Sequence, residues 1–379
     1  MKKSFVEKEY TSTIPSVNKS ARMYHIDGMK GILCFMVMFG HFWNIYRGCQ
    51  EKSMIAHPLF DRISESFIGD PLLVASFWLY AFLVISGFLL SVTRIRSVSE
   101  LMIKSVKRFL RFCLPVFGAC VFIFLLQETV GFYVEETEVF FTNNWFQKYY
   151  RTNIEWYSIF TESFRAIATA SCQFNAPFWV VRDMFLSSVI IYICNYVDYG
   201  RERKNNIIPI LCFLNAVYVD RPVIIACLAG YLLGYYKDQV SKLVERKLLY
   251  LVLVIAVFLC AKLLMVQKIL PSVFDKICLY IIVWCAIVAY INQSVKLVKF
   301  FSGKIFLLMS KISFGIYSFH WPVICSIGSY VLIKGLENKW GTINLLGLSL
   351  LVSVLCTIGI SIIYRLTVEK TADKIIRMF

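Results

Sequence analysis

The sequence predicts an all-α fold, a polytopic integral membrane helix bundle of about ten transmembrane helices. Of the 379 residues, 58% are hydrophobic and the mean hydropathy is +0.65, whereas ordinary soluble domains are about 45–50% apolar. Charged residues make up 17% of the chain and cluster between apolar runs. Because every backbone group must be hydrogen-bonded internally in lipid, such runs favour helices. The alternating ten-residue segments typical of a transmembrane barrel do not occur in the sequence.

Ten apolar runs are predicted to span the membrane, where a helix needs about 20 apolar residues. The fifth and sixth runs are short and are separated by Asp220-Arg221-Pro222, so their boundaries are the least sharply defined. In chain order, the predicted spans are residues 31–47, 71–93, 112–134, 177–199, 207–220, 222–237, 248–268, 273–292, 305–333 and 342–364.

The distribution of Lys and Arg predicts the orientation of the bundle. If both termini are cytoplasmic, the inner segments hold 27 of these residues and the outer segments hold 11, as the positive-inside rule requires. The net charge of +16 is then explained by basic inner loops that face anionic lipid, and no nucleic-acid partner is expected. We expect one membrane domain at residues 23–366, between cytoplasmic tails at residues 1–22 and 367–379.

Neither a disulfide framework nor a metal site is expected. The 13 cysteines stand singly, mostly inside apolar runs, where cysteine acts as a small hydrophobe. The longest predicted outer segment, residues 135–176, is rich in aromatic residues and is interpreted as an interfacial helix plus loop. An aromatic belt at the lipid headgroups is the favoured role for it, and a platform beside an acceptor site is the alternative.

The first span carries Lys30 and, eleven positions later, His41. At about 1.5 Å per residue, the two side chains are separated by roughly 16 Å along a helix, so a Lys30 at one membrane face places His41 near the middle of the hydrocarbon. Ionisable residues at that depth are rare and usually functional, and histidine exchanges a proton near neutral pH. This pair therefore indicates chemistry inside the membrane.

Two basic residues, Arg108 and Arg111, precede Pro115 at the predicted cytoplasmic edge of the third span. Their i,i+3 spacing places them on one helix face, and guanidinium groups favour bidentate contacts with phosphate. From spacing alone, anchoring by the positive-inside rule is the favoured interpretation.

A polar stripe lies in the ninth span, where Ser313, Tyr317 and His320 fall at positions i, i+4 and i+7. Such a stripe in an apolar helix is expected to face the interior of the bundle. Helix–helix hydrogen bonding explains the stripe as well as a catalytic role does.

For three further features, a structural role is considered before a chemical one. Arg182 and Asp183, which follow Trp179 in the fourth span, are interpreted as a structural ion pair. Ser86-Gly87 in the second span favours close helix packing. Asn44 lies one turn after His41 and is a candidate to orient it.

Together these motifs resemble the acyltransferase 3 family of integral-membrane acyltransferases. The resemblance rests on motifs in family order over about residues 22–365, which covers nearly the whole chain. They are His25-Ile-Asp-Gly-Met-Lys-Gly with Gly40-His41, Phe82-Leu-Val-Ile-Ser-Gly-Phe-Leu-Leu-Ser91, Arg108-x-x-Arg111 with Pro115, Pro177-Phe-Trp179, and Ile316-Tyr-Ser-Phe-His-Trp-Pro322.

The resemblance implies an O-acyltransferase that uses acyl-CoA. Family members move an acyl group, usually acetyl from acetyl-CoA, to sugar hydroxyls of surface or lipid-linked glycans. The family histidine maps onto His41, and the family arginine maps onto Lys30, which keeps the charge but lacks the guanidinium fork. The Arg-x-x-Arg motif, which the family associates with the donor, maps onto Arg108 and Arg111 unchanged.

The resulting expectation is a membrane-only enzyme in the bacterial inner membrane, with acetyl-CoA as acyl donor, no metal, and a glycan or lipid-linked saccharide as acceptor. His41 is expected to act as general base or as covalent acyl carrier, with His320 and Tyr317 as further catalytic candidates. Lys30, Arg108 and Arg111 are expected to bind the donor phosphates. The candidates for lining the substrate pocket are Asn44, Ser86, Trp179, Arg182 and Ser313.

A transporter or flippase of a lipid-linked saccharide or small polar solute is the alternative, since intramembrane ionisable residues suit that function too. It predicts internal pseudo-symmetry, and the two halves of the sequence show none. A noncatalytic sensor or scaffold would leave the ordered motifs without a purpose.

Overall fold

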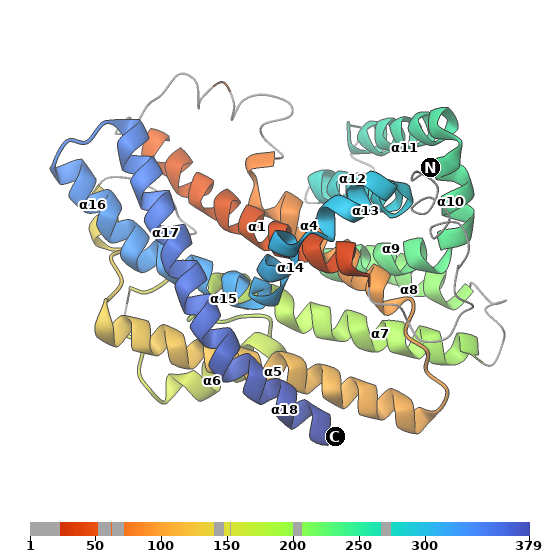
Figure 1. Cartoon of the computed structure of the whole chain (residues 1–379), viewed down its shortest axis with the longest axis horizontal. Coiled ribbons are helices and arrows are strands. Elements are labelled where there is room, and N and C mark those ends of the chain that lie inside the picture. Colours follow the sequence, from red (N-terminus) through yellow and green to blue (C-terminus); the bar gives the residue numbers. More distant parts are fainter. Residues whose placement is uncertain are drawn as a thin grey trace, which may run out of the picture.

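The computed structural model describes residues 23–51, 62, 72–139, 148–151, 153–199, 207–266 and 274–379, and within these ranges it contains helices and no strand. This confirms the predicted all-α class (Figure 1). Some predicted segments lie outside the described residues. These are the tail 1–22, residue 71 of the second span, residues 267 and 268 of the seventh, and residue 273 of the eighth. The helical elements are α1 Tyr24–Glu51, α4 Ala75–Leu90, α5 Val98–Thr129, η1 Glu136–Val139, α6 Ser158–Ala168, η3 Ala176–Val180, α7 Val181–Tyr199, α8 Ile207–Tyr218, α9 Pro222–Tyr235, α10 Lys237–Glu245, α11 Lys247–Val266, α12 Phe274–Gln293, α13 Val295–Phe301, α14 Lys304–Lys311, α15 Ser313–Val323, η4 Ile324–Gly328, α16 Ser329–Glu337, α17 Thr342–Tyr364, η5 Arg365–Glu369 and α18 Lys370–Met378.

Each predicted span lies on one or more of these helices. However, fewer than ten of the described helices have the length and apolar composition to cross a membrane. Among the described residues, four helical stretches do so: Val98–Thr129, Ala176–Tyr199, Ser313–Glu337 and Thr342–Met378. A fifth is possible if Ile277–Gln293 and Val295–Phe301, which are bent by 99° at their junction, form one span. The number of ten crossings and the orientation of the termini therefore stay predictions.

The predicted ninth span, 305–333, is not a single straight helix. It is divided at Ile312, where α14 ends and α15 begins, and it passes through the π-helical segment η4 before α16. The two parts have different neighbours, because α14 packs on α1 whereas α15 packs on both α17 and α1. The division therefore lets α15 turn its polar stripe toward the bundle.

The long helix α5 begins at a capping motif and is held near its middle by a contact with α17. The Ser97 side chain accepts a hydrogen bond from the Glu100 backbone N–H at 3.2 Å, and Glu100 accepts one from the Arg96 backbone N–H at 2.9 Å, which satisfies free donors at the helix start. Further along, the Tyr364 hydroxyl donates to the Pro115 carbonyl oxygen at 2.5 Å.

Small residues allow the helices to cross closely. A Cβ atom on Gly87 of α4 would lie 1.7 Å from the Cys227 carbonyl oxygen of α9, and one on Gly230 of α9 would lie 1.9 Å from the Val84 carbonyl oxygen of α4. The packing role predicted for Ser86-Gly87 is confirmed by this contact. The neighbouring Ser86 hydroxyl donates to the Phe82 carbonyl oxygen at 2.8 Å within its own helix.

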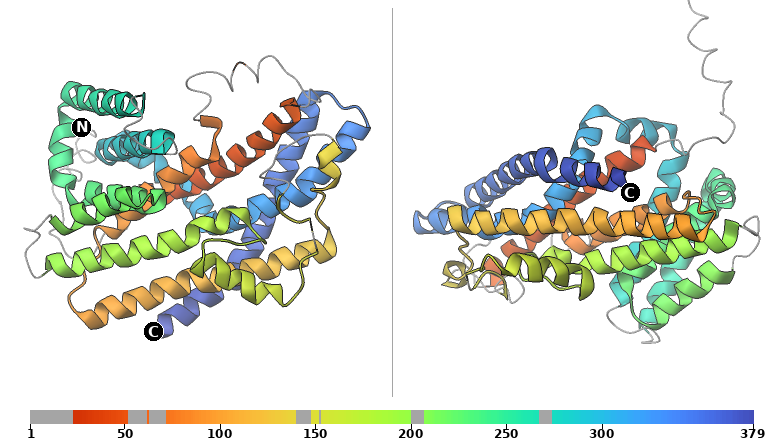
Figure 2. Two further views of the ribbon diagram at one scale, coloured as in Figure 1. Left: turned by 180° about the vertical axis from the view of Figure 1, so that it is seen from behind. Right: turned by 90° about the horizontal axis from the view of Figure 1, so that it is seen from below.

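The helices form a bundle in which α1 is central. It packs against α4, α14 and α15, while α5 packs against α6, α7 and α18. Figures 1 and 2 show α10, α11 and α12 grouped at one end, away from α16 and α17.

On the short amphipathic helix α6, Phe160 and Phe164 are exposed, as the interfacial interpretation of residues 135–176 expects. Residues 140–147 and 152 of that segment lie outside the described ones.

Candidate functional site

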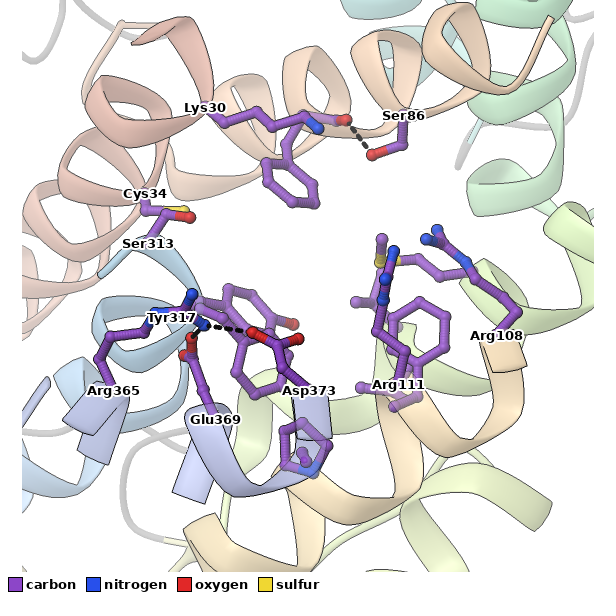
Figure 3. Close-up of a pocket in the computed structure, with 18 of the residues that line it drawn as sticks. Lys30, Cys34, Ser86, Arg108, Arg111, Ser313, Tyr317, Arg365, Glu369 and Asp373 are labelled. Atoms are coloured by element: carbon purple, nitrogen blue, oxygen red, sulfur yellow. Dashed lines mark hydrogen bonds and ion pairs between the residues drawn. The ribbon is translucent and has the colours of Figure 1, made fainter. Parts of the chain in front are cut away.

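A cavity of about 370 Å³ lies where α1, α4, α5, α7 and α15 meet the C-terminal helices (Figure 3). It is enclosed mainly by apolar side chains, and a few charged and hydroxyl groups converge on it, as in many ligand sites. Six of the residues predicted from sequence line it: Lys30, Ser86, Arg108, Arg111, Ser313 and Tyr317.

Three cations of the cavity, Lys30, Arg108 and Arg111, come from two helices that are far apart in sequence. In Figure 3, Lys30 of α1 lies across an open space from Arg108 and Arg111 of α5. The Arg108 Nε donates to the Ser188 hydroxyl oxygen at 3.0 Å, and the guanidinium lies 4.7 Å from the centre of the Phe112 ring. Because Nε is the engaged nitrogen, the two Nη groups form the tip that can meet a ligand.

Three charged residues of the cavity were not predicted from the sequence: Arg365, Glu369 and Asp373. The Arg365 Nη1 lies 2.6 Å from the Glu369 Oε2 and 3.2 Å from the Asp373 Oδ2. They lie on η5 and α18, in or beside the segment 367–379 that the sequence analysis assigned to a tail. Their spacing of four residues, with one basic residue followed by two acidic ones, was the available signal, because it marks one face of a helix.

A histidine pair forms beyond the cavity, between α1 and α15. The rings of His41 and His320 are stacked, with centroids 5.1 Å apart and planes 19° apart. The His320 side chain is fully buried, and its Nδ1 lies 3.0 Å from the Ile316 carbonyl oxygen. Since a carbonyl oxygen accepts hydrogen bonds, Nδ1 carries the proton in the neutral ring and Nε2 carries the lone pair.

Tyr317 connects the cavity to the histidine pair. It lines the cavity, and its ring centroid is 6.1 Å from that of His320. Its hydroxyl donates to the Pro177 carbonyl oxygen, which ties α15 to η3. On α1, eleven residues at about 100° each bring His41 to within about 20° of the face that carries Lys30. The two polar faces of α1 and α15 therefore run from the cavity to the histidine pair.

The match to known proteins agrees with this arrangement. The model of the acyltransferase 3 family, described as an acyltransferase domain, matches residues 23–363. The chain belongs to this family. Neither a curated protein nor a solved structure matches the chain.

In this acyltransferase, five of the predicted site residues do not line the first cavity. Two of them, His41 and His320, form the stacked pair beyond it. Asn44 is exposed on α1, and Trp179 is 38% exposed on η3. The Arg182 Nε donates to the Asp183 Oδ1 at 2.9 Å, which confirms the predicted ion pair, and Arg182 borders a second, largely apolar cavity between α5, α6 and α7.

Proposed function

We propose that this membrane acyltransferase moves an acyl group, with acetyl as the expected one, from cytoplasmic acyl-CoA to a hydroxyl of a glycan or lipid-linked saccharide. The bacterial inner membrane is its proposed location. One observation carries the proposal. Cations from α1 and α5 line a cavity, and Tyr317, which lines the same cavity, lies beside one of two stacked histidines.

The charge and shape of the cavity suit the phosphates of acyl-CoA. Arg108 and Arg111 offer planar guanidinium groups that can bind phosphate through two hydrogen bonds each, and Lys30 offers a point charge on the opposite wall. The predicted topology places these three residues near the cytoplasmic side, where acyl-CoA is available. The acyl end of the donor would then extend past Tyr317 toward the histidine pair.

Two versions of the transfer step fit the histidine pair. In the first, His41 removes the proton from the acceptor hydroxyl, whose oxygen attacks the thioester carbonyl while the thiolate of CoA leaves. In the second, a ring nitrogen of His41 attacks the thioester and releases CoA, and the hydroxyl then takes the acyl group from the imidazole. In both versions His320, which stacks on His41, orients the reactive ring.

The test uses the purified protein in lipid nanodiscs with radiolabelled acetyl-CoA, with and without candidate glycans. We expect transfer of label to a glycan by the wild type and its loss in His41→Ala. Tyr218→Phe is a suitable control, because Tyr218 is 89% exposed on α8 and does not line the cavity. Absence of label transfer with every glycan, together with saccharide movement across a vesicle membrane, would contradict the proposal in favour of a transporter.

A further inference from the structure

The buried wall of the cavity contains a carboxylate whose two oxygens have different surroundings. Oε2 of Glu369 accepts an ion-pair hydrogen bond from the Arg365 Nη1 at 2.6 Å. Oε1 is buried and has no hydrogen-bond partner among the described residues. The Glu369 side chain is 10% exposed, so bulk water does not solvate it freely.

A buried acceptor without a donor is unfavourable, and such atoms are uncommon in folded proteins. An ionised carboxylate can only accept hydrogen bonds. The group that satisfies Oε1 must therefore carry an N–H or O–H and cannot be a fully ionised phosphate. Figure 3 shows Glu369 on the wall with Arg365 and Asp373, across the cavity from Arg108 and Arg111. A ligand whose phosphates lie on the arginines would present a different part of itself to Glu369.

We propose that Glu369 recognises the acyl donor by accepting a hydrogen bond from one of its N–H or O–H groups. This inference rests on the proposed function. Acyl-CoA carries such groups in two places. The pantetheine arm has two amides and a hydroxyl, and the nucleotide has the adenine amino group and the ribose 2′-hydroxyl. Arg365 is then a positioning residue, because its bond to Oε2 holds the carboxylate and directs Oε1 to the ligand.

The direction in which ligand affinity changes when Glu369 is removed distinguishes this role from a purely electrostatic one. If Glu369 contributes only negative charge, its removal from a phosphate-binding cavity strengthens the binding of an anionic ligand. If it accepts a hydrogen bond from the ligand, its removal weakens binding. A hydrogen bond to a charged group corresponds to an affinity change of about 10- to 150-fold.

The experiment measures the Kd of three ligands by calorimetry on the full chain in nanodiscs. The ligands are CoA, adenosine 3′,5′-bisphosphate, which lacks the pantetheine amides, and 4′-phosphopantetheine, which lacks adenine. For Glu369→Ala we expect the Kd of CoA to rise about tenfold or more, together with that of the one fragment that carries the recognised N–H or O–H. The fragment whose Kd rises identifies the part of acyl-CoA that holds the donor group.

Asp373→Ala is the matched control, because it removes the other carboxylate beside Arg365 but leaves Glu369 in place. We expect it to bind CoA as tightly as the wild type or more tightly. If Glu369→Ala does not fold, Glu369→Gln keeps the shape and a neutral acceptor, and we expect a smaller rise in the Kd of CoA. Unchanged or tighter binding of all three ligands in the variant that folds would overturn the inference. A wild type that binds no CoA would instead overturn the proposed function, and the role of Glu369 with it.

Discussion

Replacement of Ser188 by alanine tests how Arg108 is held for a phosphate. Ser188 is buried on α7 and does not line the cavity, but its hydroxyl oxygen accepts the bond from the Arg108 Nε at 3.0 Å. The same hydroxyl donates to the Met184 carbonyl oxygen at 2.7 Å. Ser188→Ala removes the anchor of the guanidinium without removing its charge.

The contacts of Arg108 determine how much donor binding is expected to weaken in each variant. A hydrogen bond to a charged group contributes about 1.5–3 kcal/mol, but Arg108 retains its packing over Phe112, which contributes about 0.5–2 kcal/mol. We therefore expect Ser188→Ala to weaken donor binding by about 1 kcal/mol, which is about a fivefold rise in the KM for acyl-CoA. Arg108→Ala removes the phosphate contact itself and should raise this KM by about 10- to 150-fold. In both variants kcat should change little, because neither residue contacts the histidine pair.

The assay measures initial rates against acyl-CoA concentration at matched protein levels in nanodiscs. Lys104→Ala is the control, because Lys104 lies one turn before Arg108 on α5, pairs with Glu100 at 2.7 Å and does not line the cavity. An unchanged KM in Arg108→Ala, with inverted topology instead, would show that this arginine is only a positive-inside anchor. A larger rise in the KM for acyl-CoA in Ser188→Ala than in Arg108→Ala would refute the reasoning that Ser188 acts by holding Arg108.

Three further predictions concern the remaining site and the packing. His41→Ala should lower turnover by about 10²- to 10⁴-fold at an unchanged level of protein in the membrane, whereas loss of the protein from the membrane would assign His41 a structural role. Lys30→Arg should keep or improve donor affinity and Lys30→Ala should weaken it, and equal affinity in Lys30→Ala and the wild type would remove Lys30 from the site. Gly87→Ala should lower the Tm, measured by thermal unfolding in detergent, because the new Cβ would lie 1.7 Å from the Cys227 carbonyl oxygen. Gly359→Ala, which has nothing within 4 Å of its Cβ, should leave the Tm nearly unchanged, and equal losses in both variants would contradict the packing argument.

Local patterns in the sequence were enough to predict the helical class and much of the site. Among the described residues, each of the ten apolar runs lies on one or more helices, because apolar length and backbone hydrogen bonding act within one segment. Local sequence also predicts which residues share a helix face. The spacing of Ser313, Tyr317 and His320, and that of Arg108 and Arg111, follows from the helical period alone.

The division at Ile312 and the role of the C-terminal segment were not predictable in this way. An apolar run does not reveal a division such as the one between α14 and α15, because the division follows from tertiary packing: both parts contact α1, and α15 also packs on α17. Glu369 and Asp373 were expected to lie in a cytoplasmic tail, although their spacing from Arg365 places all three on one helix face. Only the packing of α18 on α5 brings that face to the cavity.

The sequence by itself determined which segments are helical and which polar residues share a face of one helix. The tertiary structure decided which faces meet. It stacks His41 on His320, which is 279 positions away, and leaves Arg182 paired with Asp183 beside a different cavity. The reason is physical: the helical period defines the direction of a side chain relative to its own axis, whereas its neighbours depend on how whole helices cross. Those crossings are governed by contacts between distant small residues, such as that of Gly87 with the backbone of α9.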